Sequence, residues 1–436
     1  MLDKLTKDFS YKILDDYGKF SLDDVEISIL SSDNISLKSR NLKIENIERS
    51  KNLAINVNVY KNKRKATISL NNIEKSKPSD LLERGCAMVK SMPIDKFCGL
   101  PNSDNYADEI VNLDLEDKGN PNENQLLEEA KIAEAAMLEN KIITNTEGAS
   151  RSYSKNTISL FTSKGFQSSY NKTFHSLSCI AIAGKDTNMQ RDYEYSTSIH
   201  SSDMMTPTEI GKKAADRASS RLNSRKIKSC SLDILFEPRV AKSILSSFSS
   251  CASGASIARG TSFLNNKLKS AIFNKNITIT NNPRLKRGLG SKPYDSDGTK
   301  NNNLTIVNKG ILDNYFLATR SARQLNLSAH GNSSPSNLIL QNGEKSLNDL
   351  ISGIDDGFFV TEMLGMSFNA VNGDYSRGAA GFKIDKGELS YPVSEVTIAG
   401  NMVDMLQNLT PAKDLEINDN INSPSILIEN MTLAGL

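Results

Sequence analysis

Histidine and tryptophan are the residue types in shortest supply, because the 436-residue chain has three histidines and no tryptophan. A zinc or acid–base site built on histidine can therefore draw on very few side chains. The five cysteines are widely spaced and form no C-x-x-C pair: Cys86, Cys98, Cys179, Cys230 and Cys251. This spacing argues against a disulfide scaffold and a zinc ribbon, so we expect a cytoplasmic protein with reduced thiols.

Long apolar runs and an excess of charge of one sign are also missing. No run approaches the roughly 20 apolar residues that span a bilayer, and residues 1–20 lack the apolar core of a signal peptide. The chain has 53 basic and 51 acidic residues, which gives a net charge of +2. We therefore expect neither a membrane nor a nucleic acid as partner. The length predicts two or three domains with cores of their own.

The periodicity of the first half predicts two α+β units, residues 1–92 and 122–228, joined by a loop at 93–121. In each unit we expect a helix, a set of antiparallel strands and a second helix. The helices are expected at about 2–18, 78–92, 122–140 and 207–222. The strands are expected at 25–29, 35–37, 55–59, 66–70, 157–162, 166–170, 174–183 and 189–198. Thr206–Glu209 is a capping box with proline at the first helical position.

Glycine is concentrated in the second half, where 17 of the 25 glycines follow Lys228. Residues 229–436 are therefore predicted to form a β-rich domain of short strands and tight turns. Its regular elements are expected to be a strand at 232–236, helices at 238–251 and 346–353, and a closing strand at 423–436. Two similar hairpins are expected to turn at Asn308–Gly310 and Asp385–Gly387. The predicted fold class is α+β.

The glycine-rich stretch Val360–Asn401 is a candidate functional face of this domain. Its exposed-looking polar side chains lie between small residues: Asn369, Asp374, Tyr375, Ser376 and Arg377. Glycine lets a ligand or a second chain approach the backbone closely. An ion pair between Asp374 and Arg377 that locks a loop explains the pattern equally well, and the residues leave both interpretations open.

Long collinear runs in the second half match one known family. They include FEPRVAKSIL (236–245), SGASIARGTSFL (253–264), RSARQLNL (320–327) and DGFFVTEMLGMSFNAVNGDYSRGAAGF (356–382). These runs resemble the PmbA/TldE class of the TldD/PmbA peptidase family. The resemblance covers all of residues 229–436 and extends more loosely through the N-terminal units.

The resemblance implies a subunit that works in a heterodimer with a TldD-type partner. In that family the complex encloses a cavity and cleaves unfolded peptides, and the TldD-type subunit binds zinc through an H-E-x-x-x-H helix motif and a later cysteine. The corresponding positions here fall at about Leu245, Ser246 and Ser250, and no cysteine follows Cys251. A zinc peptidase needs three protein ligands and a general base. We therefore expect no metal ligand, catalytic residue or cofactor in this chain, with zinc on the partner.

Structural explanations are favoured for the remaining reactive side chains. His330 is interpreted as a solvated turn histidine rather than a lone base, and His175 and His200 as structural residues on or beside strands. Asp295–Gly298 resembles the start of a calcium loop, but no acidic residue follows at the bidentate position, so a turn is expected.

The serines of the helix at 238–251 and its Cys251 could supply a nucleophile. Without a histidine beside them, a small-residue face for close packing is the preferred interpretation. Arg284, Lys286 and Arg287 form a basic loop, for which contact with phosphate or with a partner carboxylate is the alternative to a plain surface loop.

The sequence thus predicts the non-metal-binding subunit of a metallopeptidase complex, which shapes the cavity and holds unfolded peptide by strand addition. The residues predicted to contact peptide or partner are Arg259, Gly260, Thr261, Ser262, Asn369, Asp374, Tyr375, Ser376 and Arg377. A self-sufficient non-metal peptidase that uses His330 is one alternative. A regulator of DNA gyrase, as an older family name suggests, is another, and a homodimer remains open.

Overall fold

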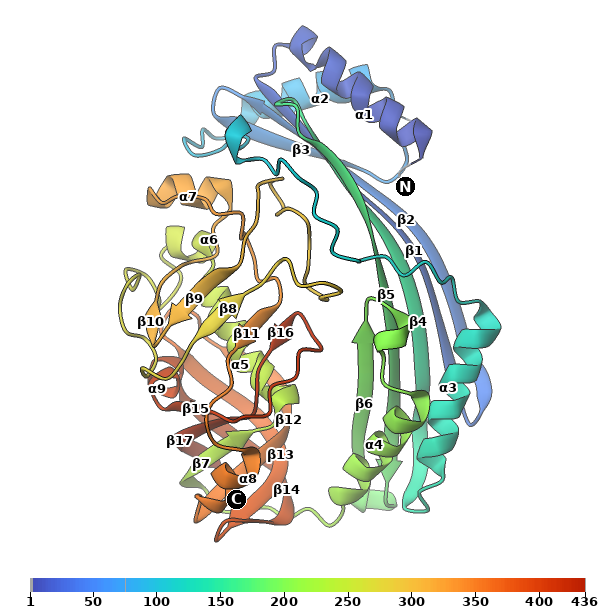
Figure 1. The fold of residues 1–436 in the computed structure, drawn as a ribbon, viewed down its shortest axis with the longest axis vertical. Helices are drawn as coiled ribbons and strands as arrows, with labels where there is room; N and C mark the ends of the chain where they lie inside the picture. The colour runs from blue at the N-terminus through green and yellow to red at the C-terminus, as the bar shows by residue number, and fades with distance from the viewer. Residues whose placement is uncertain (1–2, 75, 436) are drawn as a thin grey trace.

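The computed structural model describes residues 3–74 and 76–435 and consists of two bodies (Figure 1). One is a long curved sheet with helices on one face, and the other is a β-rich domain. The predicted α+β fold class is confirmed. Leu2 and Leu436, predicted to begin the first helix and to end the last strand, lie outside the described residues.

The first body is a six-stranded sheet in the order β3-β2-β1-β4-β5-β6. Its strands are β1 (Asp24–Arg40), β2 (Lys43–Lys61), β3 (Arg64–Leu70), β4 (Ile143–Thr162), β5 (Gln167–Ala183) and β6 (Gln190–Ser198). The strands predicted at 25–29 and 35–37 are one strand, because residues 31–34 stay paired with both β2 and β4 although their side chains are not buried. The strands predicted at 166–170 and 174–183 likewise form one strand, β5. Since β1 pairs with β4, the strands of both predicted units belong to a single sheet.

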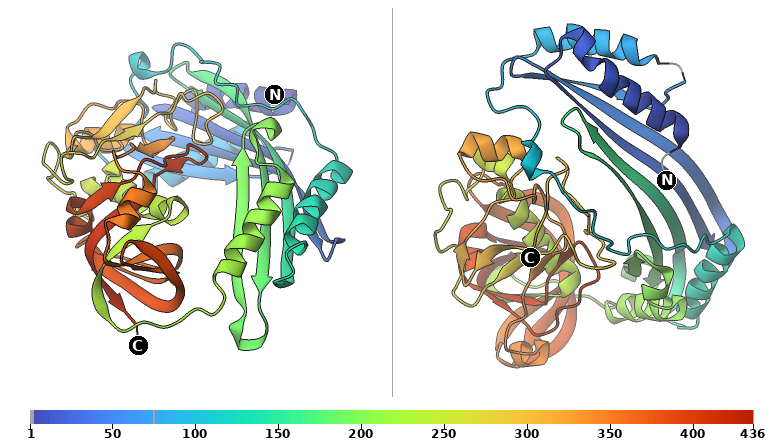
Figure 2. Two further views of the ribbon diagram at one scale, coloured as in Figure 1. Left: turned by 60° about the horizontal axis from the view of Figure 1, so that its bottom comes forward. Right: turned by 45° about the horizontal axis from the view of Figure 1, so that its top comes forward.

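The described helices cover one face of this sheet and leave the other face without a helix (Figure 2). The helices are α1 (Lys4–Asp16) and α2 (Pro78–Ser91) on one half, and α3 (Glu123–Leu138) and α4 (Pro207–Ser220) on the other. Odd-numbered residues of β1 such as Val25 and Leu37 are buried beneath them. Because side chains alternate along a strand, even-numbered residues such as Ser32 and Ser36 point to the helix-free face, where they stay half-buried.

The second body contains a closed barrel with the strand order β14-β13-β12-β7-β17, because β14 also pairs with β17. Its strands are β7 (Cys230–Phe236), β12 (Asp356–Phe368), β13 (Asp374–Asp385), β14 (Glu388–Asn401) and β17 (Ile426–Ala434), with β15 (Leu409–Pro411) beside β17. A five-stranded sheet, β10-β9-β8-β11-β16, accompanies it. Its strands are β8 (Ile279–Asn281), β9 (Leu304–Asn308), β10 (Ile311–Leu312), β11 (Leu338–Leu340) and β16 (Ile421–Asn422). Both predicted hairpins, β9–β10 and β13–β14, are confirmed.

Helix α5 (Pro238–Cys251) follows β7 directly and buries Ile244, Leu245 and Phe248 in the core of the second body. The shorter helices are α6 (Gly254–Ala258), α7 (Thr319–Leu325), α8 (Leu347–Ser352) and α9 (Met402–Gln407). Within the described part of the chain, no helix has the length and apolar character of a membrane span.

The predicted connecting loop at 93–121 ties the two bodies together (Figure 1). Arg323 of α7 donates hydrogen bonds to the carbonyl oxygens of Gly99 and Leu100, at 3.0 and 2.6 Å. Farther along the loop, the carbonyl oxygen of Leu113 accepts a hydrogen bond from the backbone N–H of Arg287. The loop therefore contacts the β-rich domain at several places before it reaches α3.

Candidate functional site

A cleft of about 780 Å³ lies where the edge of the curved sheet meets the second body. One wall is β6 with the facing side of α4, and the opposite wall is the N-terminal half of α5 (Figure 1). The loops 285–289 and 414–423 complete the lining. The cleft therefore depends on four segments that are distant in the sequence.

Two tyrosines of β6 face two cations of α5 across this junction. Tyr193 and Tyr195 are two residues apart on a strand, and Arg239 and Lys242 are three apart on a helix, so each pair shares one face of its element. The guanidinium carbon of Arg239 lies 4.8 Å from the centroid of the Tyr193 ring, and Nζ of Lys242 lies 5.1 Å from that of Tyr195. These are cation–π distances. The contacts hold β6 and α5 together along one side of the cleft.

The buried carboxylate of Asp192, next to Tyr193 on β6, pairs with arginines from both bodies. Asp192 is 3% exposed. Its Oδ1 lies 3.0 Å from Nη1 of Arg239 on α5, and its Oδ2 lies 3.3 Å from Nη1 of Arg221, just after α4. Burial alone would lower the pKa of Arg239, but Glu237 and Asp192 raise it well above its ordinary value. Paired charges of this kind fix the junction, because breaking a buried pair leaves an uncompensated ion.

Lys242 is a cation of the cleft lining that joins two of its segments. Its Nζ donates to Oη of Tyr195 and to the carboxylate of Asp419. Burial lowers the pKa of Lys242, but the hydrogen bonds to Asp419 and Tyr195 outweigh it, so the pKa is raised overall. An amine must lose its proton to act as a nucleophile. Lys242 is therefore suited to binding and bridging at neutral pH rather than to covalent catalysis.

The C-terminal half of α5 borders a second cavity of about 470 Å³ that is rich in serine. Its lining includes Ser246, Ser249, Ser250, Ser253, Ser256, Ser333 and Ser334. Close packing, the preferred interpretation of the helix serines, holds for Ser249, which is buried, but not for Ser246 and Ser250, which open onto this cavity. The hydroxyls of Ser249 and Ser250 donate to the carbonyl oxygen of Ser246. Among the described residues, no histidine lines the cavity, and no group of three or more His, Cys, Asp or Glu is placed to hold a metal ion.

The structure brings together the two segments predicted to contact peptide or partner. The backbone N–H of Phe263 donates to the carbonyl oxygen of Ala370 at 2.8 Å, which places the loop 259–262 beside the β12–β13 turn. Arg259, Gly260, Thr261 and Asn369 are exposed there. Ser262 is buried and donates to the carbonyl oxygen of Cys251 at 2.8 Å, so its hydroxyl has a structural partner.

Two expectations about the β12–β13 hairpin are wrong. Tyr375 is not exposed but 3% accessible and packed in the core, because alternation along β13 turns it inward. Asp374 and Arg377 do not pair: Arg377 donates to the carbonyl oxygen of Gly365 at 2.6 Å, whereas Asp374 accepts from the side-chain amide of Asn372. None of the residues predicted to contact peptide or partner is in the described lining of either cavity. Their contact with peptide or partner stays a prediction.

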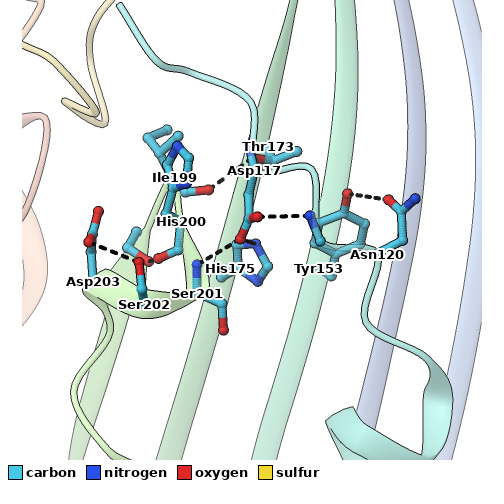
Figure 3. A network of polar contacts seen from close by, with 12 residues as sticks. Asp117, Asn120, Tyr153, Thr173, His175, Ile199, His200, Ser201, Ser202 and Asp203 are labelled. Atoms are coloured by element: carbon cyan, nitrogen blue, oxygen red, sulfur yellow. Dashed lines mark hydrogen bonds and ion pairs between the residues drawn. The ribbon is translucent and has the colours of Figure 1, made fainter.

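His175 and His200 fasten the loop 93–121 to the sheet (Figure 3). Nε2 of buried His175 lies 3.1 Å from Oδ2 of Asp117, and burial lowers the pKa of His175. Asp117 also accepts the backbone N–H of Ser201, as Figure 3 shows. Nε2 of His200 lies 3.0 Å from the carbonyl oxygen of Asp114. Both contacts agree with a structural role.

His330 differs from its expected state. Its ring is half-buried, and neither ring nitrogen has a hydrogen-bond partner among the described residues. Burial lowers its pKa. The interpretation of His330 as a solvated turn residue is therefore wrong, because both ring nitrogens are buried.

Two loop interpretations are resolved by hydrogen bonds within the chain. Oδ1 of Asp295 accepts the backbone N–H groups of Asp297 and Thr299 at 2.9 and 3.0 Å, so the predicted turn is confirmed. Arg287 does meet carboxylates, but they belong to its own chain: Asp114, at 2.6 Å, and Asp203, at 3.1 Å.

The residues that line the cleft most closely were not singled out from the sequence. Tyr195, Lys242 and Asp419 lie in three separate elements, and none belongs to a recognisable catalytic motif. The available signals were the alternating tyrosines of β6 and the basic residues three apart in α5. Neither signal reveals that the two elements face each other.

The fold and the cleft define an α+β protein in which a curved sheet and a barrel domain share a polar cleft. Models of the PmbA/TldA metallopeptidase central and C-terminal domains match residues 115–222 and 229–435. The chain is 33% identical over 95% of its length to metalloprotease PmbA of Escherichia coli O157:H7, and covers 92% of that protein. It belongs to the PmbA/TldD family.

Solved structures agree with this assignment. A Bacteroides thetaiotaomicron protein, described as a proposed modulator of DNA gyrase, matches over 100% of both chains with a TM-score of 0.92 and 26% identity. TldE from Thermococcus kodakarensis shares the fold, with a TM-score of 0.82 and 20% identity over 98% of this chain and 100% of that chain.

Proposed function

We propose that this chain is the non-metal-binding subunit of a TldD/PmbA-type peptidase complex, and that it holds unfolded peptide while a TldD-type partner supplies the zinc site. The observation that carries the proposal is the outer face of α5. The resemblance places the metal-motif positions of a TldD-type subunit at about Leu245, Ser246 and Ser250. Leu245 is buried in the core, whereas Ser246 and Ser250 open onto a serine-lined cavity. A serine hydroxyl does not replace a histidine or carboxylate as a zinc ligand.

The helix-free face of the sheet supports a role in holding peptide. Its half-buried side chains are mostly small and polar, as Ser152, Ser154, Ser176 and Ser178 illustrate. This face points toward the second body, and the cleft lies at its β6 edge (Figure 1). A polar, weakly charged wall suits peptides of varied sequence, since main-chain groups are common to all of them. Because curated relatives are named metalloproteases, hydrolysis of peptide bonds is the proposed reaction class.

Co-purification with a TldD-type subunit tests the proposal. We expect a stable complex that cleaves an unfolded peptide and loses this activity with a zinc chelator. The isolated chain is expected to have no activity and to bind no zinc after dialysis against zinc and exhaustive washing, as measured by atomic absorption. Zinc bound stoichiometrically by the isolated chain would overturn the assignment.

The His330→Ala variant separates this proposal from a self-sufficient hydrolase. In the proposed role the variant complex cleaves peptide as fast as the original one, because His330 lies outside both cavities described above. Cleavage by the isolated chain that survives a chelator and disappears in His330→Ala would instead establish a non-metal peptidase.

A further inference from the structure

The outer edge of β6 is the edge that faces away from β5. Along its first half, outward-pointing backbone groups are hydrogen-bonded to arginine side chains or to carboxylates of β6 itself. Along this strand the backbone groups of alternate residues point away from β5. At Arg191 the outward carbonyl accepts from Arg221 at 3.0 Å, and at Tyr193 it accepts from Arg239 at 2.8 Å. The N–H groups of Tyr193 and Tyr195 donate to the carboxylates of Asp192 and Glu194.

The next part of the same edge is open. By the same alternation, the carbonyl of Tyr195 and both backbone groups of Thr197 point outward, and within the described residues they have no hydrogen-bond partner. Residues 194–198 line the cleft of about 780 Å³. An unpaired edge inside a cleft is a template for another strand, because each exposed N–H and C=O gains a partner when a strand is added.

We propose that the open edge at Tyr195–Thr197 pairs with the main chain of an extended peptide, which lies in the cleft as an additional strand beside β6. The inference rests on the proposed function and gives it a location in this chain. Strand addition reads the peptide backbone rather than its side chains, so the ligand class is unfolded peptide of varied sequence.

The surrounding residues limit the length of the added strand. Arg239 occupies the carbonyl of Tyr193, so pairing stops at that end. Near the other end, Arg287 pairs with Asp203, and both residues line the cleft. Between these limits, Lys242 and Lys213 flank the edge on opposite walls. A short peptide segment therefore forms main-chain pairs here, while the rest of the peptide extends over the helix-free face.

A backbone-modified peptide tests the pairing directly. The probe is a fluorescein-labelled, capped peptide of alternating alanine and threonine, titrated with the full chain and followed by fluorescence anisotropy. A second peptide of the same sequence is N-methylated at every residue, which removes the N–H donors of both edges, so that neither edge can pair normally with β6. We expect the methylated peptide to bind at least about fivefold more weakly, which corresponds to one lost hydrogen bond.

Thr197→Pro removes the outward donor of the protein without removing a bond of the sheet, because that N–H does not face β5. We expect this variant to bind the unmodified peptide about fivefold more weakly than the original chain. Thr197→Val is the matched control, since it keeps the N–H and is expected to bind normally. Thermal unfolding of both variants shows whether the fold is intact.

The outcomes separate the inference from the proposed function. Equal binding of both peptides, no binding, or normal binding by Thr197→Pro would overturn strand addition at β6, even if the complex with a TldD-type subunit forms and cleaves peptide. If the complex fails to form while the chain still discriminates the methylated peptide, the proposed function fails but the site stands.

Discussion

The curved sheet meets the β-rich domain at two largely enclosed cations, Arg239 and Lys172. Arg239 pairs with carboxylates, whereas Lys172 donates to backbone carbonyl oxygens. At β6, Arg239 is paired with the carboxylates of Asp192 and Glu237, and its pKa is raised. At β5, Lys172 is 8% exposed, and its hydrogen bonds within the described part of the chain go to the carbonyl oxygens of Leu289 and Ser291, at 2.7 and 2.9 Å. Burial, with Lys292 nearby, lowers the pKa of Lys172 to about 8.

The comparison shows what decides whether the pKa of an enclosed cation is raised or lowered in this protein. Burial alone disfavours the charged form, and carbonyl dipoles do not fully offset that cost at Lys172. A carboxylate partner reverses the direction of the shift at Arg239. The β6 contact should therefore be a permanent ionic junction, whereas the contribution of the β5 contact to stability should change with pH as Lys172 titrates.

The largest expected effect comes from breaking the β6 junction. Asp192→Ala leaves Arg221 and Arg239 buried without their shared carboxylate, so we expect a loss of about 3–5 kcal/mol in the free energy of unfolding. Urea denaturation measures it. Glu123→Ala, which removes the exposed partner of Arg49, serves as the control and should cost less than about 1 kcal/mol. Equal losses in both variants would contradict the comparison.

The β5 contact should make stability depend on alkaline pH. The folded pKa of Lys172 is about 8, whereas an unfolded lysine titrates near about 10.4. Between these values the unfolded chain binds more protons than the folded one, so the free energy of unfolding rises with pH, by up to about 1.4 kcal/mol per pH unit. The contribution is absent below about pH 8.

The Lys172→Met variant tests whether Lys172 causes this rise in the free energy of unfolding with pH. Denaturation at several pH values from about 7.5 to 10.5 should show the rise in the original chain and a flatter profile in the variant. The Lys300→Met control removes an exposed cation that pairs with Asp108 and should keep the original profile. Identical profiles for all three proteins would show that Lys172 is not the group responsible.

A smaller effect is expected at the cation that bridges the cleft. Lys242→Met keeps most of the apolar stem but loses the bonds to Tyr195 and Asp419, so we expect a loss of about 1.5–3 kcal/mol. Lys213→Met is a matched control, because Lys213 lines the same cleft and forms no ion pair among the described residues. Thermal unfolding should distinguish the two variants, and similar melting temperatures would refute the bridging role.

The smallest effect is expected on the serine side of α5. Ser250 is exposed, and its hydroxyl bonds only to a carbonyl of its own helix. Ser250→Ala should change the free energy of unfolding by less than about 0.5 kcal/mol. A loss comparable to that of Lys242→Met would mean that this half of α5 is as firmly held as the charged half.

The local sequence pattern was enough to predict most of the long helices and strands, but it did not predict the residues that line the cleft. Val25, Ile27 and Ile29 located β1, and the capping box at Thr206 located the start of α4. The pattern was lost at residues 31–34, where pairing with two neighbouring strands maintains β1 without burying side chains. The sequence around Tyr375 looked polar because its neighbours are, although strand alternation points Tyr375 into the core.

The cleft itself depends on long-range geometry. Tyr195 meets Lys242, and Lys242 meets Asp419, only because the sheet curves toward a barrel whose closing strands are far apart in the chain. No local propensity encodes such a meeting. The scarcity of histidine is a fact of composition, and the expectation that this chain binds no metal stays a prediction.

The closed barrel has a consequence for biosynthesis. Strand β7 begins the second body, but its neighbours β12 and β17 come much later in the chain, and β17 is also the strand that completes the ring with β14. At about 5–20 residues per second, a ribosome needs roughly 10–40 s to synthesise the chain from the end of β7 to the end of β17. Until β17 has been synthesised, β7 lacks one of its two neighbouring strands and the ring cannot close, so the nascent domain presents open strand edges to other chains. Protection of the emerging chain by chaperones should matter more for this half of the protein than for the sheet that precedes it, where every pairing except β1–β4 joins consecutive strands.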